Sequence, residues 1–350
     1  MNNILKNKTI LVTGGTGSFG KQFIKILIKS CDPKKIIIFS RDELKQYEMK
    51  NSIHSKFLKI MRFFVGDIRD LARLKTAMSN VDYVIHAAAL KHVPIAEYNP
   101  VEFVKTNILG SQNIIDAAIE SNVSKVVALS TDKAAAPINL YGATKLTADK
   151  LFVAANNVSG DKNINFSVVR YGNVMNSRGS VLPLFLSQSS KKFFTVTDKE
   201  MTRFIITLEQ GVELVLKTLK SMIGGEIFVP KIPSFKIVDL TKAINSNKKI
   251  LITGIRPGEK IHEEMITYAD SFSTVDCGDY FSILPFGDNK IEDYLKFNSK
   301  FQRVEYGFSY NSSTNNDFLS VEKLRTLIKK YVDPNFIPRW KSSYLMGNKI

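Results

Sequence analysis

The sequence predicts an α/β protein built on a doubly wound parallel sheet, followed by a smaller mixed α/β domain. Short runs rich in isoleucine and valine recur at regular intervals through residue 172. Segments of helical length, with apolar residues at helical spacing, lie between these runs. The runs are apolar on both faces, which is typical of parallel strands covered by helices on both sides.

The first domain is expected over residues 1–172. Its strands are expected at 9–14, 35–40, 61–67, 82–88, 125–131 and 165–172. Segments such as 21–30 and 111–122 are typical of the helices that join them. Parallel strands joined through a helix almost always have a right-handed crossover, which places helices on the sheet faces.

The rhythm changes after residue 172. We expect a smaller substrate domain over 173–286, some elements of which can return to the first domain. Its strands are expected at 193–198, 226–230, 249–254 and 280–285, and its helices at 208–220 and 238–244. A C-terminal extension covers 287–350, with a polar, irregular part at 287–316 and an amphipathic helix at 320–332.

The composition excludes several classes of protein. The chain has 350 residues, 44% of them hydrophobic, and no run reaches the roughly 18 apolar residues that a membrane helix needs. Its first residues lead directly into a strand without the apolar core of a signal peptide, so a cytoplasmic protein is expected. Two cysteines and four dispersed histidines indicate neither a disulfide framework nor a metal site.

The chain is basic, with 49 lysines and arginines against 33 acidic residues and a net charge of +16. Most of such charge is a solvated surface. The alternative is attraction of anionic ligands, because positive fields gather phosphates. The charge is not accompanied by a zinc-finger, homeodomain or aromatic RNA-binding signature, which disfavours nucleic acid as a partner.

A glycine-rich turn separates the first expected strand from the first helix. The turn reads GGTGSFG (14–20), and its expected cofactor contacts are Gly14, Thr16, Gly17, Ser18, Phe19 and Gly20. Glycines here let the backbone turn tightly and approach a pyrophosphate, while the helix N-terminus offers free N–H groups. The turn therefore indicates dinucleotide binding, with an unoccupied tight turn as the alternative.

The second expected strand ends in Ser40-Arg41-Asp42. Arg41 can bind a ribose 2′-phosphate, which favours NADP. The alternative is NAD, with Asp42 accepting the 2′-hydroxyl and Arg41 in solvent. The other expected cofactor contacts are Leu44, Lys45, Asp67, Ile68, Ala87, Ala88, Ala89, Lys91, Tyr141 and Lys145.

A candidate chemical site follows the fifth expected strand, which ends in Ser130-Thr131. Tyr141 and Lys145 are four residues apart and share one face of a helix. A nearby ammonium favours the phenolate of a tyrosine that must exchange a proton.

With these residues the sequence resembles the extended short-chain dehydrogenase/reductase family. The strings that carry a narrower resemblance are HAAALKHVPIAEYNP (86–100), STDKAAAPINLYGATK (130–145), RYGNV (170–174), NSRGSV (176–181), MTRF (201–204) and GIRPGEK (254–260). Together they are similar to the inverting UDP-N-acetylglucosamine 4,6-dehydratases, the first enzymes of pseudaminic acid synthesis. The resemblance covers about residues 7–270. Related dehydratases and epimerases for capsule or O-antigen precursors share most of it.

The resemblance implies roles for five catalytic residues. Tyr141, assisted by Thr131 and Lys145, exchanges the C4 hydroxyl proton during hydride transfer with tightly bound NADP. Lys133 then removes the C5 proton while Asp132 protonates the departing C6 hydroxyl, and C5 is inverted. Retaining dehydratases carry Asp-Glu at this place, and simple C4 epimerases lack the pair. The alternative for Lys133 is a solvated lysine after a strand.

The resemblance also implies UDP-N-acetylglucosamine as substrate and a homo-oligomer, from dimer to hexamer. The expected substrate contacts are Lys91, Lys133, Asn173, Val181, Thr195, Arg256 and Glu259. Arg256 suits the diphosphate, because a guanidinium binds it through two parallel hydrogen bonds; a surface ion pair is the alternative. Ala136 and Asn176 stand where relatives more often have asparagine and glycine.

Two other functions remain open. An NADP-dependent oxidoreductase or C4 epimerase would leave Asp132 and Lys133 without a role. A non-catalytic NADP sensor would usually have lost the tyrosine or the lysine, and Tyr141 and Lys145 are both present.

Overall fold

The structure is a computed structural model that describes residues 4–177, 180–285, 290–297 and 300–338. The chain divides into two compact units that alternate along the sequence. The first unit consists of Met1–Tyr171, Leu208–Lys231 and Met265–Ser309. The second consists of Gly172–Thr207, Ile232–Glu264 and Tyr310–Ile350.

This division differs from the boundaries expected from the sequence. The stretch 173–286 contributes to both units, and so does the stretch 287–350. The expected strands at 226–230 and 280–285 belong to the large sheet of the first unit and not to a separate smaller sheet.

The first unit is built on one large sheet. Its strands are β1 (Thr9–Thr13), β2 (Lys35–Ser40), β3 (Met61–Val65), β4 (Tyr83–His86), β5 (Lys125–Thr131), β6 (Asn165–Tyr171), β10 (Ile227–Pro230), β14 (Thr274–Asp276), β15 (Tyr280–Ile283) and β16 (Gln302–Arg303). They lie in the order β16-β14-β15-β10-β6-β5-β4-β1-β2-β3. From β10 to β3 all neighbours are parallel, which confirms the doubly wound parallel sheet. The edge strands β15, β14 and β16 are antiparallel.

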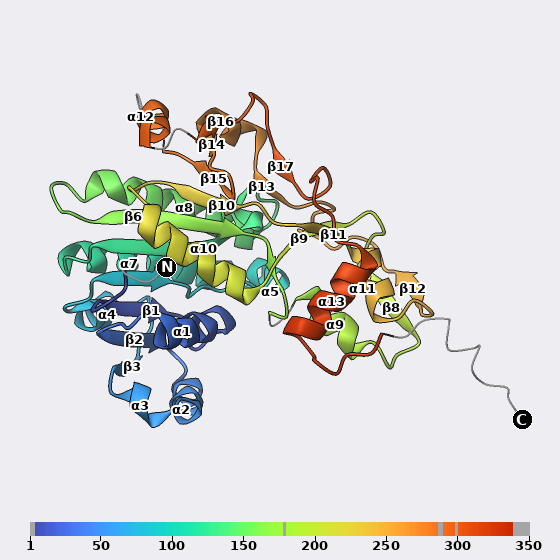
Figure 1. Cartoon of the computed structure of the whole chain (residues 1–350), viewed down its shortest axis with the longest axis horizontal. Coiled ribbons are helices and arrows are strands. Elements are labelled where there is room, and N and C mark those ends of the chain that lie inside the picture. The colour runs from blue at the N-terminus through green and yellow to red at the C-terminus, as the bar shows by residue number, and fades with distance from the viewer. Residues whose placement is uncertain (1–3, 178–179, 286–289, 298–299, 339–350) are drawn as a thin grey trace, which may run out of the picture. The chain divides into compact units, whose positions relative to one another are not determined.

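Helices cover both faces of this sheet (Figure 1). The helices of this unit are α1 (Ser18–Ser30), α2 (Glu43–Ser52), α3 (Ser55–Leu58), α4 (Leu71–Met78), α5 (Val93–Tyr98), α6 (Pro100–Phe103), the π-helix η1 (Val104–Leu109), α7 (Gly110–Glu120), the 3-10 helix η2 (Asp132–Ala134), α8 (Leu140–Val158), α10 (Leu208–Ser221), η3 (Tyr268–Ser273) and α12 (Lys290–Phe297). Helix α1 packs beside α10, and α7 packs beside α4 and α8. Helix α1 buries Phe23, Ile24 and Leu27, one apolar face at helical spacing.

The second unit is smaller and mixed, as expected. Its elements are β7 (Asn173–Val174), α9 (Val181–Ser187), β8 (Phe193–Val196), β9 (Thr202–Ile206), β11 (Ser234–Lys236), α11 (Ile237–Ile244), β12 (Lys249–Ile252), β17 (Tyr310–Asn311) and α13 (Val321–Tyr331). Strands β11, β9 and β7 form one small sheet, and β8 pairs with β12 in parallel. Phe185, Phe194, Phe235 and Leu324 contribute to a shared core. The terminal helix is therefore an integral part of this unit.

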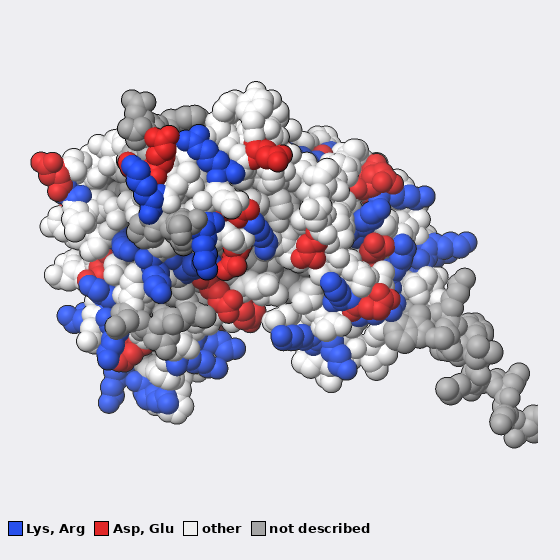
Figure 2. Space-filling model, turned by 45° about the horizontal axis from the view of Figure 1, so that its top comes forward, with Lys and Arg blue, Asp and Glu red and all other residues white. Residues whose placement is uncertain are grey.

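The expectation of an irregular segment at 287–316 was wrong in part. It contains α12, whose Tyr294 is buried, and the short strands β16 and β17. In the portions of the chain that are described, no helix combines the length and apolar character needed to cross a membrane. Basic and acidic side chains are interspersed on the face shown in Figure 2, as in a solvated surface.

Candidate active site

The glycine-rich turn joins β1 to α1 and closely approaches the end of β4. Gly14 has a φ of +64°, and a Cβ there would lie 2.9 Å from the backbone of Ala87. A Cβ at Gly20 would lie 2.5 Å from the Cα of Gly15. Gly17 is the N-cap of α1 and has no side chain with which to cap it. The turn thus forms a cradle of bare backbone at a helix N-terminus, which suits an anionic group.

The other residues expected in the turn line its surroundings. Thr16 is buried, and the ring of Phe19 stacks on Phe23 with centroids 5.8 Å apart. At the end of β4, the N–H groups of Ala87 and Ala88 donate to Thr13 Oγ1 at 3.2 and 3.3 Å. These bonds hold the small-residue loop, which continues to Ala89, against the turn.

Arg41 and Asp42, at the end of β2, have different surroundings. Asp42 caps α2 and accepts from Lys45 N at 2.9 Å through Oδ1, while Lys45 Nζ pairs with Oδ2. The side-chain hydrogen bond from Lys45 is the main cause that lowers the pKa of Asp42. The Arg41 side chain is 53% exposed and lies 3.6 Å from Asp67. The carboxylate of Asp42 is therefore occupied by its own helix, whereas the Arg41 guanidinium extends toward solvent.

Around this strand end, Ser40 is buried and accepts from Gln46 Nε2 at 3.1 Å, while Leu44 is exposed on α2. Burial works to raise the pKa of Asp67, but hydrogen bonds from Arg69 and the charges of Arg69 and Arg41 lower it. Ile68 is buried next to it. The structure thus leaves a carboxylate and an apolar side chain at the end of β3.

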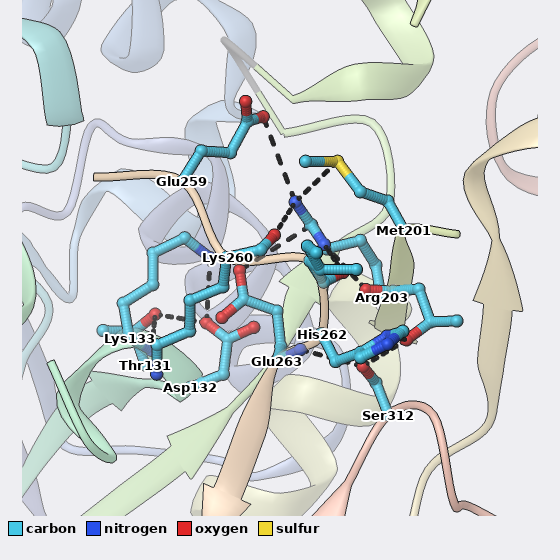
Figure 3. Close-up of polar contacts among 12 residues, drawn as sticks. Thr131, Asp132, Lys133, Met201, Arg203, Glu259, Lys260, His262, Glu263 and Ser312 are labelled. Carbon is cyan, nitrogen blue, oxygen red and sulfur yellow. Dashed lines mark hydrogen bonds and ion pairs between the residues drawn. The ribbon is translucent and has the colours of Figure 1, made fainter. Parts of the chain in front are cut away.

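The turn after β5 brings together three of the expected catalytic residues (Figure 3). Asp132 is fully buried, and its Oδ1 accepts from Thr131 Oγ1 at 2.8 Å and from Lys133 Nζ at 3.1 Å. Its Oδ2 is buried and has no hydrogen-bond partner among the described residues. A carboxyl oxygen without a partner beside an ammonium is an arrangement suited to proton transfer.

Tyr141 and Lys145 face the same turn from α8. Asn139 caps this helix, accepting from Gly142 N at 2.8 Å. Burial raises the pKa of Tyr141 to about 12, although the charge of Lys133 and a hydrogen bond with Thr131 act to lower it. Lys145 is 4% exposed and donates to Leu129 O at 2.7 Å. Burial lowers the pKa of its ammonium, against the charge of Asp149.

Lys91 lies in the loop after β4. Burial of its ammonium and the charge of Lys133 lower its pKa, so the two lysines act on one another electrostatically. The expected cofactor and catalytic residues, Lys91 and Lys133 included, all lie in the first unit.

The remaining expected substrate contacts lie in the second unit. Asn173 is in β7, Val181 is the first residue of α9, and Thr195 in β8 accepts from Gln188 Nε2 at 2.8 Å. Arg256 and Glu259 belong to the turn after β12, where Arg256 N is 3.4 Å from Glu259 Oε2.

A buried arginine holds that turn in place (Figure 3). Arg203 donates to the carbonyls of Lys260 and Ile261 at 3.0 and 2.9 Å and lies 4.0 Å from Glu259. The turn that carries Arg256 is therefore anchored at its C-terminal end, while the Arg256 residue itself is exposed.

Two departures from the pattern of relatives fall at unusual backbone conformations. Ala136 has a φ of 43° and Asn176 a φ of 59°. Glycine and asparagine adopt this left-handed region more readily than alanine does. Asparagine at the first position and glycine at the second, the residues that the resemblance leads us to expect, would therefore adopt these conformations with less strain. Arg178 and Gly179 of the NSRGSV string lie outside the described residues.

The sequence reasoning missed two buried polar residues beside the site. Asn107 lies in the π-helix η1 and binds the backbone of Leu90 through two hydrogen bonds. Its Oδ1 accepts from Leu90 N and its Nδ2 donates to Leu90 O, both at 2.9 Å. Asp149 lies four residues after Lys145 on α8 and is 2% exposed. Helical spacing from Tyr141 and Lys145 could have found Asp149, whereas nothing in the local sequence marks the π-helix. The described residues contain no group of side chains arranged to hold a metal ion.

Comparison with known proteins places this site in a family. Residues 10–285 match the family model described as polysaccharide biosynthesis protein. The chain is 53% identical over 333 residues to a UDP-N-acetylglucosamine 4,6-dehydratase (inverting) of Campylobacter jejuni, covering 93% of this chain and 98% of that protein. It is 41% identical to a UDP-glucose 4-epimerase of Rickettsia canadensis, covering 92% and 95%.

Among solved structures, the chain is similar to Pen from Bacillus thuringiensis. The two share 40% identity with a TM-score of 0.83, over 93% of this chain and 98% of that one. The family match and these similarities cover most of the sequence, the glycine-rich turn and the Tyr141–Lys145 helix included. The chain therefore belongs to the polysaccharide biosynthesis protein family and has the extended short-chain dehydrogenase/reductase fold.

Proposed function

We propose that this protein dehydrates UDP-N-acetylglucosamine to a UDP-4-keto-6-deoxy-hexosamine, UDP-2-acetamido-2,6-dideoxy-β-L-arabino-hex-4-ulose, with inversion at C5. The observation that carries the proposal is the buried Asp132 with Lys133 at 3.1 Å, next to Tyr141. A reaction limited to hydride transfer would use Tyr141 and Lys145 and leave this pair idle. The inverting dehydratase of Campylobacter jejuni supports the same substrate.

The chain's residues fit a bound NADP. Gly14 and Gly20 leave no room for a Cβ because the backbones of Ala87 and Gly15 lie against them, and Gly17 leaves the N-terminus of α1 without a side-chain cap, where a pyrophosphate can bind. The Arg41 side chain is 53% exposed and pairs with Asp67 at 3.6 Å, so its guanidinium can also meet a 2′-phosphate, while Asp42 is engaged as a helix cap. When bound, NADP would accept and return the hydride, so that it is regenerated in every turnover.

Tyr141 accepts the proton of the C4 hydroxyl as the ketone forms. Burial raises the pKa of Tyr141 to about 12, so its phenolate is costly to form. The nearby positive charge of Lys133 offsets part of that cost. The hydrogen bond with Thr131 favours the same ionised form and orients the ring oxygen. Tyr141 thus supplies the acid-base group for the C4 position.

Elimination of water needs a base at C5 and an acid at C6. The C4 ketone acidifies the C5 proton, which Lys133 takes as a neutral amine. Asp132 delivers a proton from its unpartnered Oδ2 to the C6 hydroxyl, which leaves as water. The C5=C6 double bond that results would be reduced by return of the hydride to C6 together with a proton to C5, and delivery of that proton from the opposite face inverts C5. Lys133 Nζ donates a hydrogen bond to Asp132 Oδ1, so the proton that Lys133 has taken can pass to Asp132 and restore both groups for the next turnover.

We place the substrate's diphosphate at Arg256 and a sugar or ribose hydroxyl at Glu259. Asn173, Lys91 and Val181 are proposed sugar and uridine contacts, and so is Thr195. A cytoplasmic homo-oligomer that supplies a precursor of pseudaminic acid for surface or flagellar glycans completes the proposal. The match to the polysaccharide biosynthesis family supports the supply of a glycan precursor.

A second candidate is C4 epimerisation of a UDP-sugar. The 41% identity to the Rickettsia canadensis UDP-glucose 4-epimerase favours it. An epimerase needs Tyr141 and the cofactor but neither an acid at C6 nor a base at C5. The two candidates therefore differ in whether the C6 oxygen is lost.

Proton NMR of the purified protein with UDP-N-acetylglucosamine in D2O, without added cofactor, separates them. A dehydratase gives a C6 methyl signal and a 4-keto product with deuterium at C5 and an inverted C5 coupling pattern. An epimerase gives a C4 epimer with its C6 oxygen retained and no deuterium at C5. An unchanged sugar, together with net NADP or NADPH consumption on another nucleotide sugar, would contradict the dehydratase proposal.

A further inference from the structure

Asp149 extends the catalytic face of α8 by one more turn. Tyr141, Lys145 and Asp149 are spaced by four residues each, so their side chains leave the helix on one side. Asp149 is 2% exposed, and Lys145 is 4% exposed. A carboxylate and an ammonium are thus both buried one helical turn apart, behind the tyrosine.

Two strands hold the carboxylate of Asp149 in place. Ser130 Oγ, at the end of β5, donates to Asp149 Oδ2 at 2.8 Å. Arg170 Nη2, in β6, donates to the same oxygen at 3.2 Å. Arg170 is itself fixed, because its Nη1 donates to Met265 O at 3.0 Å and lies 3.8 Å from Asp270. A buried charge held by this many partners has little freedom to reorient.

We propose that Asp149 is a positioning residue for the Tyr141–Lys145 pair, holding a fixed negative charge beside them and securing Ser130, the neighbour of Thr131. The proposal rests on the function proposed above. Lys145 is buried, and Leu129 O accepts its hydrogen bond without carrying a net charge. Asp149 forms an ion pair with Arg170, whose positive charge is shared with Asp270. The Asp149 carboxylate therefore retains negative charge that acts to keep the buried Lys145 ammonium ionised.

The direction of its electrostatic effect agrees with this role. Burial lowers the pKa of Lys145, and the charge of Asp149 acts to raise it again. The same charge acts to raise the pKa of Tyr141, to a smaller extent than burial does. Asp149 thereby keeps Lys145 a cation while keeping Tyr141 able to hold its proton between steps.

Other titratable groups around the pair cannot replace Asp149. His86 of β4 is buried with a pKa lowered to about 3, so it is neutral in the working range. Burial also raises the pKa of Tyr171 of β6, which keeps it neutral. Asp132 and Lys133 of η2 act on Tyr141 with opposite signs. Glu97 of α5 is bound to the exposed start of α8, at Leu140 N.

The test compares the pH dependence of kcat in wild type and Asp149→Asn. The amide keeps the size of the side chain and an acceptor for Ser130, and Arg170 retains Asp270 and Met265 as partners. Without the negative charge, Lys145 and Tyr141 each lose their protons at lower pH. Both limbs of the profile should therefore move toward acid by about one pH unit or more, with reduced activity at neutral pH.

Ser130→Ala is the matched control, because it removes a hydrogen bond to Asp149 and leaves the charge. The pH values at which its kcat rises and falls should equal those of the wild type, even if its maximum kcat differs. An Asp149→Asn profile that only falls in height, without moving, would overturn the proposal and leave Asp149 a structural residue.

A measurement on the wild type keeps the proposal testable if the variant does not fold. In protein labelled with 13C-lysine, the ε-carbon signal of Lys145, identified by its loss in Lys145→Arg, should report an ammonium at pH 7. A neutral amine at that pH would contradict the proposal. This result does not depend on turnover, so it is distinct from failure of the wild type to convert UDP-N-acetylglucosamine, which would contradict the proposed function instead.

Discussion

The proposed dehydration depends most on Lys133. Lys133→Ala should lower the rate of C6 methyl formation by about a hundredfold to ten-thousandfold, because it removes the proposed base at C5. NADP binding should persist, since the glycine-rich turn and the end of β2 are unchanged. The measurements are NMR of the product and the NADP content of the purified protein.

Lys296→Ala is the control, because it also removes a lysine side chain but far from the proposed site residues in the sequence. The Lys296 side chain is 77% exposed on α12, and its described ion pair is with Asp293 on the surface. It should retain the wild-type rate. A Lys133→Ala protein that dehydrates normally would show that another group takes the C5 proton.

Ala136, close to the turn after β5, has an unusual backbone conformation. Ala136, three residues after Lys133, has a φ of 43° that alanine adopts at a cost of about 1–2 kcal/mol. The strain lies in the segment that carries the proposed acid and base. A strained backbone at such a place is common in functional sites.

At the scale of elements, the contact between η2 and α8 depends on one glycine. A Cβ at Gly142 would lie 2.2 Å from Lys133 O, a backbone atom that cannot turn away. Gly142→Ala should therefore destabilise the fold by about 1–3 kcal/mol and reduce kcat, because the turn must move away from Tyr141. Urea unfolding and the rate of product formation measure the two effects.

Gly211→Ala is the matched control on α10. The nearest atoms to a Cβ there lie 4.0 Å away, so alanine fits and its helix propensity should add about 0.5–1 kcal/mol of stability. Opposite signs for the two variants are expected. Equal stability of Gly142→Ala and Gly211→Ala would show that η2 does not pack against α8 as described.

The π-helix η1 is a second element that serves the site. It lies between α6 and α7 and holds Asn107 at 2% exposure, with Nδ2 3.1 Å from Thr144 Oγ1. Thr144 precedes Lys145, and Leu90, the other partner of Asn107, precedes Lys91. Such local widening of a helix is frequent at functional sites, and here it joins the loop after β4 to helix α8, both of which carry expected site residues.

At the scale of the whole molecule, one buried histidine makes folding sensitive to acid. His86 in β4 forms a hydrogen bond between its Nδ1 and Thr13 Oγ1 at 2.9 Å. Burial disfavours the charged imidazole and lowers the pKa of His86 to about 3. In the unfolded chain a histidine titrates near pH 6.5. Above that pH both states are neutral. As pH falls from about 6.5 toward 3, the unfolded state alone gains a proton, and stability is lost.

The expected slope from His86 is at most about 1.4 kcal/mol per pH unit below pH 6.5. Denaturant unfolding of wild type and His86→Gln between pH 8 and pH 5 measures it. The variant should be less stable at pH 8 but should lose less stability on acidification. His54→Gln, at an exposed residue, is the control and should follow the wild type. Parallel curves for wild type and His86→Gln would contradict the prediction.

The sequence by itself determined the parallel sheet, the glycine-rich turn and the spacing of Tyr141 and Lys145. These features are local: apolar runs set strands, glycines permit the close approach of Gly14 to Ala87, and a period of 3.6 residues puts two side chains on one helix face. The proposed roles of Lys133 and Asp132 came from resemblance, because a lysine after a strand is in itself uninformative.

Tertiary structure decided what depends on segments far apart in the chain. Strands β10 and β15 join the large sheet after long intervening segments, and Arg170 of β6 meets Asp149 of α8 in the core. No period or spacing encodes these contacts, since they follow from how the first unit buries its apolar faces. Whether Asp132 is buried with an Oδ2 that has no hydrogen-bond partner is likewise decided only when neighbouring elements have packed.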